Sequence, residues 1–393
     1  MPPEAPTCRP REPTNGRLVG EVGGACGDLG TFIPHVVGAM TVAGLAPAGV
    51  LFGFGASCVA SGLFYGLPMA VQPMKAISAV LLTGQLTPGA TAAAGLVVGA
   101  VLLLLGATGL IGKMARLIPQ SVTAGLQLGL GLTMGWLGLT MVLQEPWIGV
   151  PALALLFGLP RLSPFLPAAP LVLLAAVVVG AAMSQTTMPA AMGFDLRPPP
   201  LVLPGGWGDV WRAVELTVVP QLPLTLTNAV IVTAAVCRDL FPERAARASV
   251  RNLALTSGAA NLLLAPFGAM PMCHGAGGVT AHHRFGARTG LAPVLLGAAL
   301  LVLALGFSSS AAALFAAIPA SAVGALLLVA GTDLAVSKRL FDARPACWPA
   351  IGIAAAATAL VNPAVGLVAG WAVELGRTLG RRLARRDTLG RMP

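Results

Sequence analysis

Apolar runs separated by short loops occupy most of the 393-residue chain, and they restrict its fold more than any other feature. A helix that crosses a bilayer needs about 20 apolar residues, and two of the runs, 73–86 and 271–281, are shorter than that. The other runs lie at 20–41, 48–66, 91–112, 118–143, 147–159, 165–188, 214–236, 251–266, 290–307, 311–333, 345–361 and 363–380. With 56% hydrophobic and 10% charged residues, the chain is predicted to be an all-α polytopic membrane protein. We expect about fourteen transmembrane segments.

The two halves of the chain carry matched landmarks. IPQSVTAGLQLGLG begins at Ile118 and IPASAVGALLLVAG at Ile318, while the Pro-Met pair at Pro73 corresponds to the pair at Pro271. Two pairs of landmarks that are separated by nearly the same number of residues indicate a duplication. Seven segments per copy is an odd number, so the second copy should lie inverted in the membrane. A seven-plus-seven inverted repeat with a short broken half-helix in each half is typical of transporters with a site at mid-membrane.

The predicted organisation follows from these landmarks. It comprises an N-terminal tail (1–17), a first repeat (18–190), an extracytoplasmic linker (191–213), a second repeat (214–382) and a C-terminal tail (383–393). If both tails are cytoplasmic, all 24 lysines and arginines except Lys75, Arg197 and Arg212 fall in stretches predicted to be cytoplasmic. This distribution obeys the positive-inside rule. We therefore expect a multi-pass protein of the cell membrane with both termini in the cytoplasm.

Charge and motifs argue against several other classes. The net charge of +10 comes from basic residues scattered through short loops without interleaved aromatics, so no nucleic-acid partner is expected. The six cysteines form no CxxC pair, which argues against disulfides and structural zinc. The chain has no HExxH motif, P-loop or Gly-x-Ser-x-Gly sequence, so it is predicted to be neither an enzyme nor an ATP-driven pump. No cofactor and no metal site are predicted.

The sequence VQPMKA places Lys75 in a stretch that is otherwise almost free of charge. Pro73 suits the first turn of a helix, so a short helix is predicted to begin there. The amino end of that helix carries unpaired N–H groups and the positive end of the helix dipole, and Lys75 adds a full charge. This combination suits an anion. The alternative is a lysine that reaches the membrane interface or pairs with Asp28 for structure alone.

The second short helix is predicted to start near Met270, in GAMPMCHGAGG, and to face the first one across the inverted repeat. Gly275 and the glycines after it allow a close approach of the backbone. His274 could bind the anion, relay protons or hydrogen-bond a neighbouring helix. Cys273 and His274 diverge if they lie on a helix, so they are not expected to form a nucleophilic dyad.

Polar residues also interrupt the first apolar run of each half. Asp28 lies in GACGDLGTFIP, where it could couple protons, organise Lys75 or cap a local helix break, and Thr31 extends the same break. In the second half, PQLPLTLTNAV supplies Gln221 and Asn228 as neutral hydrogen-bonding groups. Such side chains can line a site or hold helices together.

Four motifs, GDLGTFIP, VQPMKA, QLPLTLTN and PMCHGAGG followed by RFGARTG, resemble those of the MOT1 molybdate transporter family, relatives of the SulP (SLC26) sulfate transporters. The resemblance covers most of residues 18–380. It implies an SLC26/UraA-like fold in which a core domain moves against a gate domain, with an oxyanion held between the third and tenth helices. It also suggests a homodimer. No STAS domain follows the last apolar run, so regulation through one is not expected, and the AHH sequence at 281–283 departs from the family pattern.

The expected function is secondary-active import of a tetrahedral oxyanion by alternating access. Molybdate is the first expected substrate and sulfate the second. This order depends on the resemblance alone, because the two anions have the same charge and shape. A proton or another cation should accompany a dianion that moves against a negative-inside potential. The expected substrate-binding residues are Lys75, Gln72, Met74, Thr31, Cys273, His274, Gly275, Asn228 and Gln221, with Asp28 and His274 as coupling residues.

Several alternatives to this function remain. A general oxyanion transporter or a channel-like anion uniporter would share all of these features. A nucleobase carrier of the same architecture, an intramembrane enzyme and a non-transporting receptor fit the residues less well.

Overall fold

The structure, a computed structural model, describes residues 14–163, 167–183 and 193–389. Parts of both predicted tails and the end of the predicted first repeat therefore lie outside the described residues. Five helical stretches in the described part are long and apolar enough to cross a membrane: α3 (Pro47–Tyr65), α5 (Pro88–Thr108), α7 (Gln120–Gln144), Trp207–Leu240 and Ala320–Phe341. Four apolar helical stretches are shorter: α8 (Pro146–Leu162), α9 (Ala168–Ala182), α15 (Leu291–Gly306) and Pro345–Leu360. A helical, multi-pass architecture is confirmed, whereas the number of about fourteen spans stays a prediction.

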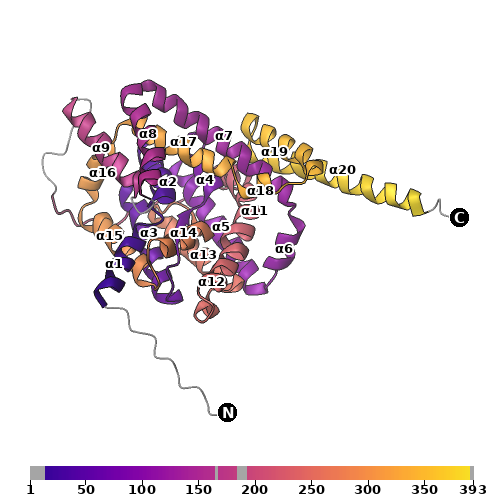
Figure 1. Ribbon diagram of the computed structural model, residues 1–393, viewed down its shortest axis with the longest axis horizontal. Helices are drawn as coiled ribbons and strands as arrows, with labels where there is room; N and C mark the ends of the chain where they lie inside the picture. Colours follow the sequence, from indigo (N-terminus) through magenta and orange to yellow (C-terminus); the bar gives the residue numbers. More distant parts are fainter. Residues whose placement is uncertain (1–13, 164–166, 184–192, 390–393) are drawn as a thin grey trace, which may run out of the picture.

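The other elements, and the parts that make up Ala320–Phe341 and Pro345–Leu360, have the following bounds. They are α1 (Thr14–Ala25), α2 (Leu29–Thr41), β1 (Val71–Pro73), α4 (Lys75–Leu82), α6 (Ile111–Leu117), α13 (Val250–Leu264), β2 (Met272–His274), α14 (Ala276–Arg284), α16 (Ser308–Ala316), α17 (Ala320–Ala335), α18 (Lys338–Phe341), α19 (Trp348–Leu360) and α20 (Pro363–Leu389), with 3₁₀ turns η3 (Ala245–Arg247), η4 (Ala265–Phe267) and η5 (Pro345–Cys347). Figure 1 shows α20 extending away from the rest of the molecule toward the C-terminus.

Two predicted runs are divided in the structure. Run 20–41 is broken between α1 and α2, at the glycine-rich stretch before Asp28, as the polar break in the sequence indicates. Run 311–333 is divided between α16 and α17, because Pro319 takes an extended conformation and precedes the first helical residue. The predicted single run was wrong there.

The stretch Trp207–Leu240 stays helical despite two internal prolines. It consists of α10 (Trp207–Ala213), the π-helical segment η1 (Val214–Val218), α11 (Val219–Leu224), the π-helical segment η2 (Thr225–Val232) and α12 (Thr233–Leu240). A proline inside an α-helix removes one backbone hydrogen bond and crowds the carbonyl four residues earlier. Wider π-turns next to Pro220 and Pro223 accommodate both prolines, and such turns are frequent at functional sites.

Helices of the two halves pack in reciprocal pairs. With an offset of about 200 residues, α3 corresponds to α13, α5 to α15 and α7 to α17. In the structure α3 packs against α15, and α13 packs against α5. Each of these two contacts is therefore the counterpart of the other in the opposite half of the chain. In two further pairs, α7 with α17 and β1 with β2, each element packs against its own counterpart from the other half. These contacts are the ones that a two-fold relation between the halves produces.

Glycines allow the reciprocal pairs to approach closely. An ideal Cβ on Gly297 of α15 would lie 2.6 Å from the carbonyl oxygen of Gly55 in α3. At the equivalent crossing, a Cβ on Gly99 of α5 would lie 2.9 Å from the carbonyl oxygen of Gly258 in α13. Both contacts are with backbone, which cannot rotate away as a side chain can. Small residues at helix crossings are typical of membrane proteins, where close van der Waals packing drives association.

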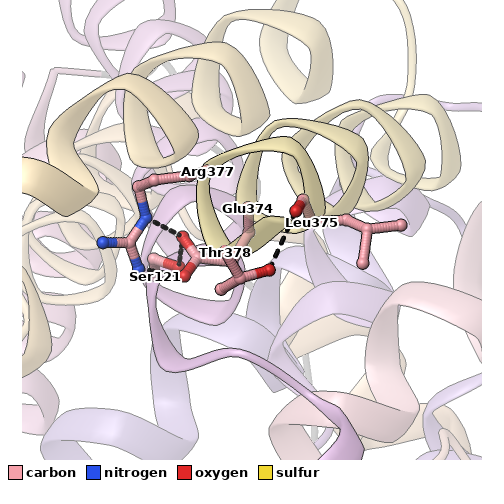
Figure 2. A network of polar contacts seen from close by, with 5 residues as sticks. All are labelled: Ser121, Glu374, Leu375, Arg377 and Thr378. Carbon is pink, nitrogen blue, oxygen red and sulfur yellow. Dashed lines mark hydrogen bonds and ion pairs between the residues drawn. The ribbon is translucent and has the colours of Figure 1, made fainter. Parts of the chain in front are cut away.

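The serine of each repeated IPxS landmark holds the start of a long helix. Ser121, at the beginning of α7, donates to Glu374 Oε2 of α20 at 3.0 Å, and Arg377 donates to the same carboxylate (Figure 2). Ser321, at the beginning of α17, donates to Glu145 Oε2 at 3.1 Å. In both landmarks the serine therefore donates to a glutamate at the start of a long helix, although the two glutamates lie on different parts of the chain.

Replacing Gly297 with alanine tests the close crossing of α3 and α15. The added methyl group must push two backbones apart, which typically costs about 1–3 kcal/mol. We expect a lower midpoint in thermal unfolding of the detergent-solubilised protein, followed by tryptophan fluorescence. Gly158→Ala in α8 is the matched control, because nothing lies within 4 Å of a Cβ at that position. Equal midpoints for the two variants would contradict the proposed packing constraint.

Candidate functional site

A cavity of about 240 Å³ lies where residues of β1, α4, β2 and α14 meet residues of α2, α11, η2, α7 and α17. It gathers eight of the nine predicted substrate-binding residues. The residues that line it are Thr31, Gln72, Pro73, Lys75, Gln127, Gln221, Leu224, Asn228, Ala229, Val232, Cys273, His274, Gly275, Ala276, Gly277 and Leu334. Met74, the ninth predicted residue, does not line the cavity, because its side chain is fully buried in the hydrophobic core. The binding role of the other eight stays a prediction.

The centre of the site is a two-stranded antiparallel sheet that the sequence did not reveal. β1 pairs with β2 with Gln72 opposite Cys273, and Met74 N–H donates to the carbonyl of Pro271. The prediction that the first short helix begins at Pro73 was therefore wrong, because Pro73 is extended and helix α4 begins at Lys75.

The same pairing corrects the second short helix. It does not start near Met270, since α14 begins at Ala276 and residues Met272–His274 form β2. Cys273 and His274 consequently lie on a strand, where successive side chains point to opposite faces, and not on a helix. The conclusion that they form no nucleophilic dyad is unaffected by this change.

Polar side chains of α13 fix β2 from its other side. Asn261 donates from Nδ2 to the Met272 carbonyl at 2.6 Å and accepts from Met272 N–H at 2.9 Å. One amide thus satisfies both backbone groups of Met272, which would otherwise be buried without partners.

Both ring nitrogens of His274 have hydrogen-bond partners. Nδ1 lies 3.2 Å from the carbonyl of Ala70, which can only accept, so Nδ1 carries a proton. Nε2 lies 2.9 Å from the hydroxyl of Thr256, and the Thr256 hydroxyl also contacts Tyr65 at 2.6 Å. The side chain is 4% exposed. These contacts fix the orientation of the ring at the cavity wall.

The amino ends of the two short helices differ. At α4, the carbonyl Oε1 of Gln221 accepts from the backbone N–H groups of Ala76 at 2.9 Å and Ile77 at 3.4 Å. Gln221 also donates to Thr225 at 2.9 Å. At α14, the residue before the first turn is Gly275, and no side-chain cap hydrogen bond is present there. The unpaired N–H groups that favour anions are therefore those of α14.

Lys75 is the cationic residue of the cavity lining. Within the described part of the chain, ion pairs join Arg197 with Asp195 and Arg377 with Glu374, and Lys75 takes part in neither. Its charge still interacts over a longer range with Asp28 and with Asp333 of α17. An ammonium group without an ion-pair partner, beside an open helix end, favours a negatively charged ligand.

The structural alternative for Lys75, an ion pair with Asp28, is not formed among the described residues. The Asp28 carboxylate accepts from Nε2 of Gln72, which lies 2.7 Å from both carboxylate oxygens. Asp28 precedes α2 without capping it through its side chain, so it does not serve the predicted capping role. The carboxylate contacts the cavity lining through Gln72.

Eight of the sixteen lining residues were not among the predicted set, and neither was Asp333 near the site. Gln127 and Leu334 complete the cavity from α7 and α17, and Asp333 lies next to Leu334. A signal for Asp333 was present, because a carboxylate in the apolar run 311–333 is costly and usually functional. Gln127 carries a similar signal, since it is a polar residue in the apolar run 118–143, whereas no local pattern marks Leu334, which only the packing of α17 brings to the cavity.

A second, larger cavity of about 630 Å³ lies between the end of α2 and the residues around Pro319. Glu145 is the charged residue among those that line it. A carboxylate repels an anion, so this cavity does not suit the predicted substrate class. The chemistry favours the smaller cavity.

Comparison with known proteins supports the resemblance. The sequence model of a family described as "Molybdate transporter of MFS superfamily" matches residues 20–134 and 214–334, which together are more than half of the chain. Molybdate transporter 2 of Arabidopsis thaliana is 33% identical over 376 residues, covering 82% of this chain and 79% of the relative. Molybdate transporter 1 of the same plant is 31% identical over 401 residues, covering 89% and 86%.

Solved structures agree in fold. The transmembrane domain of a cyanobacterium bicarbonate transporter, BicA, superposes with a TM-score of 0.69 at 16% identity, over 92% of this chain and 98% of that one. SLC26A9 superposes with a TM-score of 0.70 at 12% identity, over 95% and 67%. At such low identity these similarities concern the fold alone. Because the family model and both plant relatives match over so much of its length, the chain belongs to the molybdate transporter family.

Proposed function

We propose that the protein imports molybdate by alternating access, driven by a co-transported proton or another cation. The observation that supports this most directly is the cavity that contains Lys75 and the uncapped amino end of α14. Molybdate is a dianion at neutral pH, so one ammonium group and one helix dipole offset most of its charge. The names of the plant relatives favour molybdate within the class of oxyanions.

The size and lining of the cavity agree with a small, hydrated anion. Its volume of about 240 Å³ is several times the roughly 30 Å³ that one water molecule occupies in the liquid. A tetrahedral oxyanion and a few waters therefore fit together. Asn228 and Thr31 supply additional hydrogen-bond donors to such a ligand.

Movement of one group of helices against another is the proposed transport step. Most lining residues belong to β1, α4, β2, α14 and the α11–η2 stretch, whereas Gln127 and Leu334 belong to α7 and α17. Sliding of the α7–α17 pair past the other group would change how the cavity connects to each side of the membrane. We place both termini in the cytoplasm on the charge distribution, and we propose a homodimer on the family resemblance.

A general oxyanion transporter is the second candidate. Sulfate has the same charge and shape as molybdate, and the lining contains no group that distinguishes them by charge. A channel-like anion uniporter would use the same cavity and differs in flux kinetics alone.

Replacing Lys75 with alanine tests the proposed site. A hydrogen bond to a charged group contributes about 1.5–3 kcal/mol, so we expect kcat/KM for molybdate uptake to fall at least about tenfold. The measurement is uptake of labelled molybdate into proteoliposomes, with and without an excess of sulfate. Lys113→Ala, at an exposed position on α6, removes the same charge away from the cavity and should leave uptake unchanged.

The outcomes separate the two candidate functions. Uptake that resists sulfate and falls in Lys75→Ala supports a molybdate transporter, whereas uptake that sulfate abolishes identifies a general oxyanion transporter. A folded Lys75→Ala protein with normal uptake would show that the substrate binds elsewhere.

Cys273 offers an independent test of substrate position. It is partly exposed at the cavity, so a small water-soluble thiol reagent should modify it, and bound molybdate should slow that reaction several-fold. The extent of modification is read by mass spectrometry of the peptide that contains Cys273. Cys347, partly exposed outside the cavity, is the internal control, and its rate should not change. Equal effects of molybdate on both cysteines would argue against binding in this cavity.

A further inference from the structure

Asp28 is a buried carboxylate that has no ion pair within the described residues. It is 5% exposed, and its two oxygens share the Nε2 group of Gln72. Burying an ionised carboxylate without a cation is costly, and a proton relieves that cost. The carboxylate is therefore suited to gain and lose a proton as its surroundings change.

Groups from four elements face Asp28. Lys75 of α4 and His282 of α14 interact with it electrostatically, Cys58 of α3 lies within range of its charge, and Gln72 of β1 donates a hydrogen bond to it. His282 is itself held by the carbonyl of Gly24, 2.5 Å from its Nδ1. The hydrogen bond to Gln72 therefore links Asp28 directly to a residue that lines the cavity.

The charge of Asp28 determines which end of the Gln72 amide faces the cavity. An ionised carboxylate can only accept hydrogen bonds, so the NH₂ group of Gln72 must face Asp28. The carbonyl Oε1 then lies against Gly275, so closely that any side chain at position 275 would overlap it. In this state, an acceptor oxygen stands beside the open amino end of α14, where it repels an anion.

We propose that Asp28 and Gln72 form a proton-operated switch that couples anion binding to the uptake of one proton, an inference that rests on the oxyanion transport proposed above. When a proton binds to Asp28, the resulting acid donates its O–H to Oε1 of Gln72, and the amide turns over. The NH₂ group then faces the cavity and donates to the oxyanion. Loss of the proton reverses the rotation and weakens binding. Gly275 permits both orientations, since it has no Cβ.

His274 is the alternative proton acceptor, but its contacts do not provide the same linkage. Its Nδ1 proton is held by the Ala70 carbonyl, and Nε2 contacts Thr256 on the side of α13. Protonation of Nε2 would rearrange the hydroxyl of Thr256 and would not turn over any amide at the cavity. Coupling through Asp28 and coupling through His274 therefore predict different effects of substitutions on the pH dependence of binding.

The test measures molybdate affinity of the purified full-length protein by calorimetry, at several pH values at which molybdate itself is a dianion. Uptake of one proton per anion makes the affinity rise as pH falls, by up to about tenfold per pH unit. Repeating the titrations in buffers of different ionisation enthalpy counts the protons directly. We expect a value approaching one.

Asp28→Asn is the decisive variant. Asparagine carries no charge and can donate from its own NH₂ group to Oε1 of Gln72, so it allows the anion-binding orientation of the amide at every pH. We expect tight binding that no longer depends on pH and no proton uptake. Asp333→Asn is the matched control, because it removes another carboxylate near Lys75 and should keep the pH dependence. His274→Gln should also keep it.

Each other outcome would overturn a specific statement. Binding to the wild-type protein without proton uptake, or an unchanged pH dependence in Asp28→Asn, would overturn the switch while leaving oxyanion transport intact. Loss of the pH dependence in His274→Gln, with the dependence kept in Asp28→Asn, would assign proton coupling to His274. If Asp28→Asn does not fold, a wild-type count near zero would overturn the switch. A count near one, with the pH dependence kept in His274→Gln and Asp333→Asn, would support it. Failure of the wild-type protein to bind either molybdate or sulfate at any pH would overturn the proposed function and the switch together.

Discussion

The antiparallel pairing of β1 with β2 is the contact on which the site depends. Two three-residue strands bring the segments before α4 and α14 together, although about 200 residues separate them in sequence. The pairing satisfies backbone groups that would otherwise be unpaired deep in an apolar protein, where water is not available to replace it. Because each strand leads directly into a short helix, it also places both helix amino ends at one cavity. Asn261 of α13 completes the arrangement by binding Met272 from the opposite side.

The sequence predicted the architecture better than the details at its centre. Apolar runs and the repeated IPxS and Pro-Met landmarks indicated the duplicated helical fold, and polar residues in apolar runs identified most of the cavity lining. The strands were missed because three residues are too few to show a period of two, and a proline is compatible both with the first turn of a helix and with an edge strand. The partners of Asp28 and Gln221 could not be predicted, since both lie far away in sequence and depend on tertiary packing.

The two repeated Pro-Met landmarks lead into similar helix ends that differ in their contacts. The first is occupied by the carbonyl of Gln221 and carries Lys75, whereas the second has Gly275 and no side-chain cap. A capped end holds its helix in place and contributes little further attraction to an anion, because its N–H groups already have an acceptor. The lysine restores positive charge on that side. The cavity therefore has one side-chain cation and one exposed helix end, and not the two equivalent ends that sequence symmetry predicts.

This asymmetry explains why a carboxylate can be tolerated so near an anion site. Lys75 and the α14 dipole together supply about one and a half positive charges, which is less than a dianion carries. An ionised Asp28 would widen that deficit by a full charge, whereas a protonated Asp28 leaves it as it is and provides a neutral hydrogen-bonding group. Charge balance at the cavity thus favours the binding of a dianion together with a proton over the binding of either alone. The amide of Gln72, in contact with both Asp28 and Gly275, gives this electrostatic preference a specific structural route.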